Sequence, residues 1–215
     1  MFQDLFQAIV KGEAAQVKTL CKQKVADGIS ANDLLAQGLL PGMEEVGRLF
    51  KDGEYFLPHV IMSGKAMEAG MEVLRPLLSA SDARQRARIA LGTVQGDLHD
   101  IGKNLVGMLM AGGGFEVVDL GRDVPPERFV DAVREQGVQA IGMSALLTTT
   151  MPVMAKTVQT LNQAGLRGRV KVLVGGAPVS QRYADEIGAD GFASDAPSAV
   201  ELAKRLCGTG ILPVS

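Results

Sequence analysis

Short apolar runs alternate with helical segments of about 10 to 15 residues from Arg88 onward, and this alternation constrains the fold more than any other feature. The runs expected to be strands are residues 89–94, 115–120, 140–144, 170–174 and 191–193. Strands that alternate with helices form parallel sheets covered on both faces. The sequence therefore predicts an α/β fold, a flavodoxin-like or Rossmann-like five-stranded parallel sheet with the strand order 2-1-3-4-5.

Residues 1 to about 80 have a different period, in which apolar side chains recur every three or four positions. Two such stripes are Leu39, Met43, Val46 and Phe50, and Met67, Met71, Leu74 and Leu78. Steps of this size place an apolar face on a helix. Ser30 is expected to cap one helix, and Pro58 to lie in the first turn of another. We expect four helices that form a small antiparallel bundle.

The polar stretch SASDARQRA, residues 79–87, separates these two halves. Exposed polar segments are typical of domain boundaries. A chain of 215 residues is long enough for two small cores. We therefore expect a helical bundle over residues 1–85 and the α/β domain over residues 86–215.

The charge balance and the cysteines exclude several classes of protein. The 22 Lys and Arg residues oppose 24 Asp and Glu residues, so neither nucleic acid nor a membrane surface is an expected partner. Cys21 and Cys207 form no CxxC pair, which argues against a disulfide framework or a thiolate cluster. The first residues lack a signal-peptide pattern, and no apolar run approaches the roughly 18 residues that span a bilayer. A cytoplasmic location is therefore expected.

Three unusual loops are predicted to meet at one edge of the sheet. Ligands of such sheets bind at the carboxyl ends of the strands, beside the point where the strand order reverses. Here the loops after the first, third and fourth strands read QGDLHDIG, SALLTTT and GGAP. The topology thus predicts one site built from residues 97–102, 144–150 and 175–177.

Asp97 and His99 are the residues of this predicted site that can carry chemistry. A carboxylate beside an imidazole fixes its tautomer and raises its basicity, which suits a general base, a metal ligand or a cofactor ligand. A structural alternative is a loop histidine with Asp100 as the N-cap of a helix that begins near Ile101. A hydrolytic metal site needs three protein ligands, and the other histidine, His59, lies in the helical half.

Other reaction classes lack their motifs in this sequence. The G-x-S-x-G pattern of serine hydrolases is absent, as are the phosphate-binding patterns G-x-x-x-x-G-K-[ST] and G-x-G-x-x-G. The glycine run AGGGFE, residues 111–116, follows a predicted helix rather than a strand. We expect it to form a helix-ending turn.

The pieces Asp-x-His-x-x-Gly at 97–102, Ser-x-Leu at 144–146 and Gly-Gly at 175–176 share their spacing with a known family. Together they resemble the cobalamin-binding domain of corrinoid-dependent methyltransferases and mutases. The N-terminal helices, with GEYFLPHVIMSGKAM at residues 53–67, resemble the helical cap of the methyl-transferring branch, as in methionine synthase. The resemblance extends from about residue 1 to about residue 206. It is strongest to free-standing corrinoid proteins of systems that use methanol, methylamines, betaines or aromatic methyl ethers.

This resemblance implies that His99 ligates the cobalt from below, in place of the cofactor's own benzimidazole. Asp97 would hydrogen-bond the far nitrogen of the ring, and Ser144 would extend this relay. No catalytic residue beyond these three is implied. The residues implied to contact the cofactor are Asp97, Leu98, His99, Asp100, Ile101, Gly102, Ser144, Leu146, Thr148, Gly175, Gly176, Ala177 and Phe56.

The displaced nucleotide tail of the cofactor would need a slot beside the sheet. The resemblance implies that Ser144, Leu146 and Thr148 line this slot. Gly102 would let the tail pass close to the backbone. The glycines at 175–176 would make room, since a Cβ atom there would collide with the tail.

Phe56, Leu57 and Met62 could cover the upper face of the corrin ring. In that position they would shield methyl-cobalt from water and light. The alternative for Phe56 and Met62 is a place in the core of the helical bundle. The two alternatives differ in exposure, because core side chains are buried.

The same resemblance implies a methyl carrier rather than a complete enzyme. Its cofactor would be cobalamin or a related corrinoid, with methylcobalamin as the loaded state. A substrate-specific methyltransferase would load it, and a second methyltransferase would pass the methyl group to tetrahydrofolate or a thiol. A reductive activator would be a third partner, because the chain has no Fe–S cysteine spacing of its own. We find no segment the size of a TIM barrel, about 250 residues, that could activate a methyl donor.

Two other kinds of protein in this superfamily are alternatives to the methyl carrier. The small subunit of an adenosylcobalamin mutase shares the three motifs, but it typically lacks the helical cap. A cobalamin-based sensor shares the cap, but it needs an output module such as a helix-turn-helix, for which the chain has no candidate segment. The methyl carrier is therefore the leading interpretation.

Overall fold

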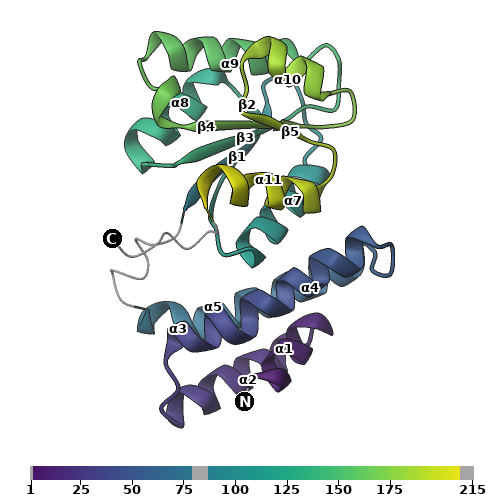
Figure 1. The fold of residues 1–215 in the computed structure, drawn as a ribbon, viewed down its shortest axis with the longest axis vertical. Helices are drawn as coiled ribbons and strands as arrows, with labels where there is room; N and C mark the ends of the chain where they lie inside the picture. Colours follow the sequence, from purple (N-terminus) through teal and green to yellow (C-terminus); the bar gives the residue numbers. More distant parts are fainter. Residues whose placement is uncertain (1, 79–86, 209–215) are drawn as a thin grey trace.

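The structure is a computed structural model that describes residues 2–78 and 87–208 (Figure 1). Residues 2–78, called the helical segment below, lie against one face of an α/β unit formed by residues 87–208, called the sheet segment. The helices of the helical segment are α1 (Gln3–Val10), α2 (Ala14–Ala26), α3 (Ala31–Leu34), α4 (Leu40–Lys51) and α5 (Leu57–Leu74). A π-helical stretch, Leu35–Leu39, joins α3 to α4, so these two form one continuous rod. Four helical rods are therefore observed among the described residues, as predicted.

Local sequence signals explain where these helices begin. The Ser30 hydroxyl accepts a hydrogen bond from the Asp33 N–H at 3.1 Å and caps α3, and Pro58 lies in the first turn of α5. Both predictions are confirmed. The predicted stripes face the core, since Leu39, Val46 and Leu74 are fully buried. Helix α5 ends at Leu74, where a 3-10 turn (Arg75–Leu77) begins, so the second stripe ends one step earlier than predicted.

The sheet segment alternates strands and helices along its whole length. Its elements are β1 (Arg88–Val94), α7 (Ile101–Gly112), β2 (Glu116–Val124), α8 (Pro126–Gln136), β3 (Ala140–Ser144), α9 (Pro152–Gln163), β4 (Lys171–Gly175), α10 (Gln181–Ile187), β5 (Gly191–Ala193) and α11 (Ala196–Cys207). All pairings are parallel and the strand order is β2-β1-β3-β4-β5, which confirms the prediction. The predicted helix-ending turn after α7 is also present.

Helices cover both faces of the sheet, with α7 and α11 on one face and α8, α9 and α10 on the other (Figure 1). One buried apolar cluster fills the face under α8 to α10. A second cluster continues without a break from the α7 and α11 face into the helical segment. Stacked layers of this kind share one apolar interior, because each helix buries both of its flanking surfaces.

The contact between the two segments is made by α4 and α5 on one side and α7 and α11 on the other (Figure 1). The backbone of α7 approaches α4 so closely that a Cβ atom at Gly112 would lie 2.6 Å from the Cβ atom of Met43. An ion pair of 2.5 Å between Lys204 on α11 and Glu44 on α4 also joins the segments. The helical segment is thus fitted to this face of the sheet by shape and by charge.

The predicted linker, residues 79–87, lies outside the described residues apart from Ala87, which is buried. None of the described helices combines the length and the apolar character needed to cross a bilayer.

Candidate functional site

Three loops meet at the carboxyl edge of the sheet and are called the loop cluster below: residues 95–102, 144–150 and 175–177. The ends of β3 and β4 lie side by side, with Ser144 paired to Gly175. The Leu146 N–H donates a hydrogen bond of 2.7 Å to the Asp97 carboxylate, which joins the first two loops. The topology therefore brings together the segments that the sequence singled out.

Asp97 is the centre of the loop cluster, although its side chain is completely buried. One carboxylate oxygen, Oδ1, accepts the His99 N–H at 3.0 Å and lies 2.7 Å from His99 Nδ1. The other, Oδ2, accepts the N–H groups of Leu146 at 2.7 Å and Leu147 at 3.2 Å, together with the Thr150 hydroxyl at 3.0 Å. Both oxygens are therefore held, and the carboxylate bridges the loops after β1 and β3.

This environment determines the charge of Asp97. Burial by itself raises the pKa of the Asp97 carboxyl. The hydrogen bonds from the backbone of His99 and Leu146, and from the side chains of His99 and Thr150, outweigh that effect and hold the pKa well below its usual range. Asp97 is consequently an ionised, acceptor-only group at neutral pH.

His99 presents the outer side of its imidazole to solvent. Its side chain is 54% exposed, while Nδ1 points inward to Asp97. An ionised carboxylate can only accept, so Nδ1 is the nitrogen that carries a proton toward Asp97, and Nε2 is the nitrogen left to bind a metal. The carbonyl oxygen of His99 also accepts the Thr93 hydroxyl at 3.1 Å, which anchors the backbone. A carboxylate-oriented imidazole with a free nitrogen is the arrangement found in metal-ligating histidines.

Four large aliphatic side chains of the loop cluster are exposed. Leu98, Ile101, Leu146 and Leu147 have exposed fractions of 61%, 70%, 44% and 41%. Clustered exposed aliphatic groups mark a surface that binds an apolar partner. The loop cluster therefore presents an exposed apolar rim, formed by these four side chains, in addition to the exposed imidazole of His99.

The glycines of the loop cluster differ in how much space a side chain would have at their positions. A Cβ atom at Gly102 would meet nothing within 4 Å, so the space beside it is open. Gly176 has φ = 126°, and a Cβ atom there would lie 1.9 Å from the carbonyl oxygen of Ala145. At Gly175 a Cβ atom would lie 3.0 Å from the carbonyl oxygen of Ala193. The chain's own backbone thus requires Gly176, in addition to any need of a bound tail.

Several predicted site residues lie in the cluster without the contacts that were expected. The Ser144 hydroxyl makes no hydrogen bond within the described part of the chain, and Thr150 is the hydroxyl that donates to Asp97. Asp100 is the N-cap residue of α7, which begins at Ile101 as expected, but its side chain accepts no capping hydrogen bond. Thr148 and Ala177 are exposed at the rim.

Thr150 lies within the predicted loop 144–150, but sequence reasoning did not assign it a hydrogen bond to Asp97. The stretch TTT at 148–150 indicated hydroxyls near the site, but only Thr150 is buried. The direction of a loop side chain depends on the loop conformation, which the sequence pattern does not encode. A signal was present nonetheless, because a buried Asp needs donors and a hydroxyl beside the next helix can supply one.

On the helical segment, Phe56 and Met62 are 64% and 51% exposed, while Leu57 is half-buried. The bundle-core alternative for Phe56 and Met62 is therefore wrong. Phe56 immediately precedes α5, and its N–H donates to His59 Nδ1 at 3.1 Å. The His59 ring in turn stacks on Tyr55, with ring centroids 4.6 Å apart. The start of α5 is thus an ordered turn with an exposed aromatic ring.

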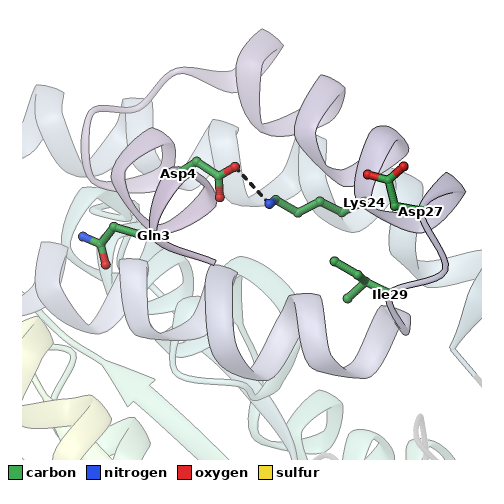
Figure 2. Close-up of a pocket in the computed structure, with 5 residues that line it drawn as sticks. All are labelled: Gln3, Asp4, Lys24, Asp27 and Ile29. Atoms are coloured by element: carbon green, nitrogen blue, oxygen red, sulfur yellow. Dashed lines mark ion pairs between the residues drawn. The ribbon is translucent and has the colours of Figure 1, made fainter. Parts of the chain in front are cut away.

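Three cavities lie elsewhere in the described structure. A groove of about 800 Å³ runs between α5 and the α7–β2 side of the sheet segment, and one of about 430 Å³ lies between α4 and α11. Figure 2 shows a third, of about 520 Å³, lined by Gln3, Asp4, Lys24, Asp27 and Ile29. It contains the 2.9 Å ion pair of Asp4 and Lys24, and no residue of the loop cluster lines it. No group of three or more His, Cys, Asp or Glu side chains that could hold a metal ion occurs among the described residues.

Comparison with known proteins places this geometry in a family. Models of the B12 binding domain match residues 87–203 and residues 1–75. The chain belongs to this B12-binding family. It is 44% identical to a corrinoid protein of Desulfitobacterium hafniense, over 97% of this chain and 98% of that protein. It is 45% identical to dimethylamine corrinoid protein 1 of Methanosarcina acetivorans, over 86% and 87% of the two chains.

A solved structure supports the same family assignment. The B12-binding chain superimposes with a TM-score of 0.86 on a chain from the methanol:cobalamin methyltransferase complex MtaBC of Methanosarcina barkeri. The identity is 32%, and the match covers 94% of this chain and 77% of that one. The order of helical segment and sheet segment is therefore that of known B12-binding proteins.

The residues of this B12-binding chain fit a corrinoid. A corrinoid would need a protein ligand for its cobalt, an apolar surface for its ring and an open path for its nucleotide tail. His99 offers Nε2, the exposed aliphatic rim offers the seat, and the space beside Gly102 is open. A single imidazole donor would suit a metal that the cofactor itself already coordinates.

Proposed function

We propose that this chain is a corrinoid-dependent methyl carrier, in which residues 1–85 act as a cap domain and residues 86–215 as the cofactor-binding domain. The observation that carries the proposal is the exposed His99 imidazole, fixed by a buried, ionised Asp97 within an apolar rim. The relatives named as corrinoid proteins of methylamine systems and the match to the MtaBC complex support the same role.

Each part of the site has a separate task in this proposal. A bound corrinoid would supply a cobalt centre able to accept and release a methyl group. His99 would bind the cobalt through Nε2. Asp97 would keep the proton on Nδ1, so that Nε2 would remain the nitrogen that can bind a metal. Leu98 and Leu146 would support the ring and exclude water from its lower side. Ser144 lies at the end of β3, where it could line the path of the tail.

The upper side of the site would be shared with partner proteins. Phe56 is exposed on the segment that would face the ring from above, so it could shield the bound methyl group until a partner displaces it. We propose two methyltransferase partners. One would deliver the methyl group from its substrate, and the other would pass it to tetrahydrofolate or a thiol. A reductive activator would restore cobalt that has been oxidised by accident.

The chain has only two histidines, which gives the central experiment a matched control. Protein labelled with ¹⁵N is loaded with hydroxocobalamin, reduced to the cobalt(II) state and examined by electron paramagnetic resonance. Ligation by a protein ¹⁵N atom splits each cobalt line into a doublet, whereas ligation by the unlabelled benzimidazole gives a triplet. We expect the doublet in the wild type and in His59→Ala, and its loss in His99→Ala. A doublet that survives in His99→Ala would contradict the proposed ligation.

The carrier role needs a second measurement on the loaded protein. A methyltransferase encoded beside this chain, supplied with its methyl donor, should methylate the reduced protein stoichiometrically. His99→Ala should lower the rate of this step, while His59→Ala should leave it close to that of the wild type. Absence of methylation with each of methanol, the methylamines, betaines and aromatic methyl ethers would count against the carrier role.

A further inference from the structure

Asp123, near the end of β2, has an unusual backbone conformation. Its φ angle is 56°, and it is the one non-glycine residue with positive φ within residues 2–78 and 87–208. This left-handed region is unfavourable for residues with a Cβ atom, although Asp tolerates it better than most. Such conformations persist where surrounding interactions hold them, and they cluster at functional sites.

Three hydrogen bonds connect the end of β2 to the start of the loop that carries His99. The Gly96 N–H donates to Asp123 Oδ1 at 2.7 Å, and the Asp123 N–H donates to the carbonyl oxygen of Asp97 at 3.1 Å. One residue earlier in the loop, the Gln95 N–H donates to the carbonyl oxygen of Val124 at 2.9 Å. Asp123 therefore uses both its side chain and its backbone to hold residues 96–97.

The regular strand pairing does not extend to these residues. The paired positions of β1 and β2 end at Val94 and Val124, and the register shifts twice between Leu91 and Val94. Gly96 then turns the chain with φ = 85°. The bonds to Asp123 therefore help to fix the backbone where the loop leaves the sheet, together with the Gln95 N–H bond to Val124 and a 3.1 Å bond from the Asp97 N–H to the carbonyl oxygen of Val94.

Asp97 is consequently held from two directions. Its carboxylate accepts hydrogen bonds from Leu146, Leu147 and Thr150 on the β3 side. Its main-chain carbonyl accepts a hydrogen bond from the Asp123 N–H on the β2 side. His99 depends on both, because Asp97 Oδ1 binds its N–H and its Nδ1.

We propose that Asp123 is a positioning residue that fixes the backbone of Asp97 and thereby orients His99 toward its metal. In this proposal Asp123 acts through the loop and does not contact the cofactor. This inference rests on the proposed function for the identity of the metal, but the hold on the loop is a property of the chain alone.

Two substitutions separate the side chain of Asp123 from its backbone conformation. Asp123→Gly accepts the left-handed conformation without strain and removes the acceptor for the Gly96 N–H, and it also frees the backbone at position 123. Asp123→Asn keeps both an acceptor oxygen and tolerance of positive φ, so it should rescue the wild-type behaviour. The control is Ser180→Ala, which removes one side chain-to-backbone hydrogen bond, from the Tyr183 N–H, in the loop after β4.

The first readout is amide hydrogen exchange at His99 in the protein without cofactor. Because the bond to Asp97 protects this amide, Asp123→Gly should raise its exchange rate about tenfold, the factor that corresponds to losing a hydrogen bond to a charged group. Asp123→Asn and Ser180→Ala should leave the rate near that of the wild type. An equal rate in Asp123→Gly and Ser180→Ala would overturn the proposal.

The second readout is the ¹⁵N doublet of protein loaded with hydroxocobalamin and reduced to cobalt(II). In Asp123→Gly the ratio of His-ligated to unligated cobalt should decrease about tenfold, for the same reason. An unchanged ratio would overturn the role of Asp123 in orientation. A wild-type spectrum without the doublet would overturn the proposed function instead, and the exchange rate of His99 would still decide whether Asp123 holds the loop.

Discussion

The loop cluster and the start of α5, which are the two parts of the proposed site, are built in opposite ways. The loop cluster centres on a buried carboxylate whose two oxygens are both occupied by donors from its own chain. The start of α5 presents Phe56 and Met62 largely exposed. The loop cluster is therefore held by hydrogen bonds within its own chain, whereas the apolar side chains at the start of α5 have no such support.

Among substitutions in the loop cluster, Gly176→Ala should reduce the stability of the protein most. The added Cβ atom would lie 1.9 Å from the Ala145 carbonyl oxygen, at a φ angle of 126° that is strained for alanine. We expect unfolding by urea to show a loss of at least about 3 kcal/mol. Gly168→Ala is the matched control, because a Cβ atom there meets nothing within 4 Å, and its stability should be nearly that of the wild type. A small loss in Gly176→Ala would mean that the loop cluster is adaptable.

Asp97→Asn should have the next largest effect, with a defined dependence on pH. The folded pKa is below the ordinary value of 3.8, so the stabilisation is complete above about pH 4 and decreases as the pH falls further. We expect a deficit of about 2 to 3 kcal/mol at neutral pH, shrinking below about pH 4.

Urea unfolding at a series of pH values measures this deficit. Asp185→Asn, on the exposed side of α10, serves as the control and should show no such dependence. A deficit that stays constant from neutral pH down to about pH 3 would contradict the charge assigned to Asp97.

The ion pair between Lys204 and Glu44 tests how firmly the two segments are joined. Both side chains are partly exposed, and pairs of this kind contribute at most about 1 kcal/mol. A double-mutant cycle with Lys204→Ala and Glu44→Ala should give a coupling within that limit, and salt should reduce it. A coupling several times larger would show that charge, rather than the packing of Met43 against Gly112, holds the segments together.

Phe56→Ala should change stability least, because this side chain is 64% exposed in the protein without cofactor. We expect the unfolding free energy to stay within about 0.5 kcal/mol of the wild type. Photolysis of the methylated, loaded protein should nevertheless become faster. Leu77→Ala, an exposed apolar side chain beyond the opposite end of α5, should change neither. A photolysis rate equal to that of the wild type would remove Phe56 from the shielding role.

The strand order and the place of the site followed from the sequence because they depend on period and topology. Alternating short apolar runs dictated a parallel sheet, and a parallel sheet dictates where its loops gather. Strand β2 was predicted too short, ending at Leu120 rather than Val124. The reason is its position at the edge of the sheet, where Arg122 and Asp123 are exposed and lie between the paired positions Gly121 and Val124. Apolar pattern does not identify such residues.

The roles of individual loop residues were less accessible to sequence reasoning. His99 and Asp97 were identified because their side chains are chemically distinctive and close in the chain. Thr150 and Asp123 were not, because each acts across a distance in sequence, on a backbone or carboxylate whose position depends on the folded loops. Hydrogen bonds of this kind depend on geometry that no local pattern encodes.

The exposed rim of Leu98, Ile101, Leu146 and Leu147 has a consequence for the protein between its synthesis and the binding of a cofactor. In newly synthesised protein this exposed apolar surface can associate with other proteins, including further copies of the same chain. A tightly bound ligand would cover the rim and shift the folding equilibrium by mass action. Supply of the cofactor would then govern how much of the protein survives synthesis, in addition to how much of it can work.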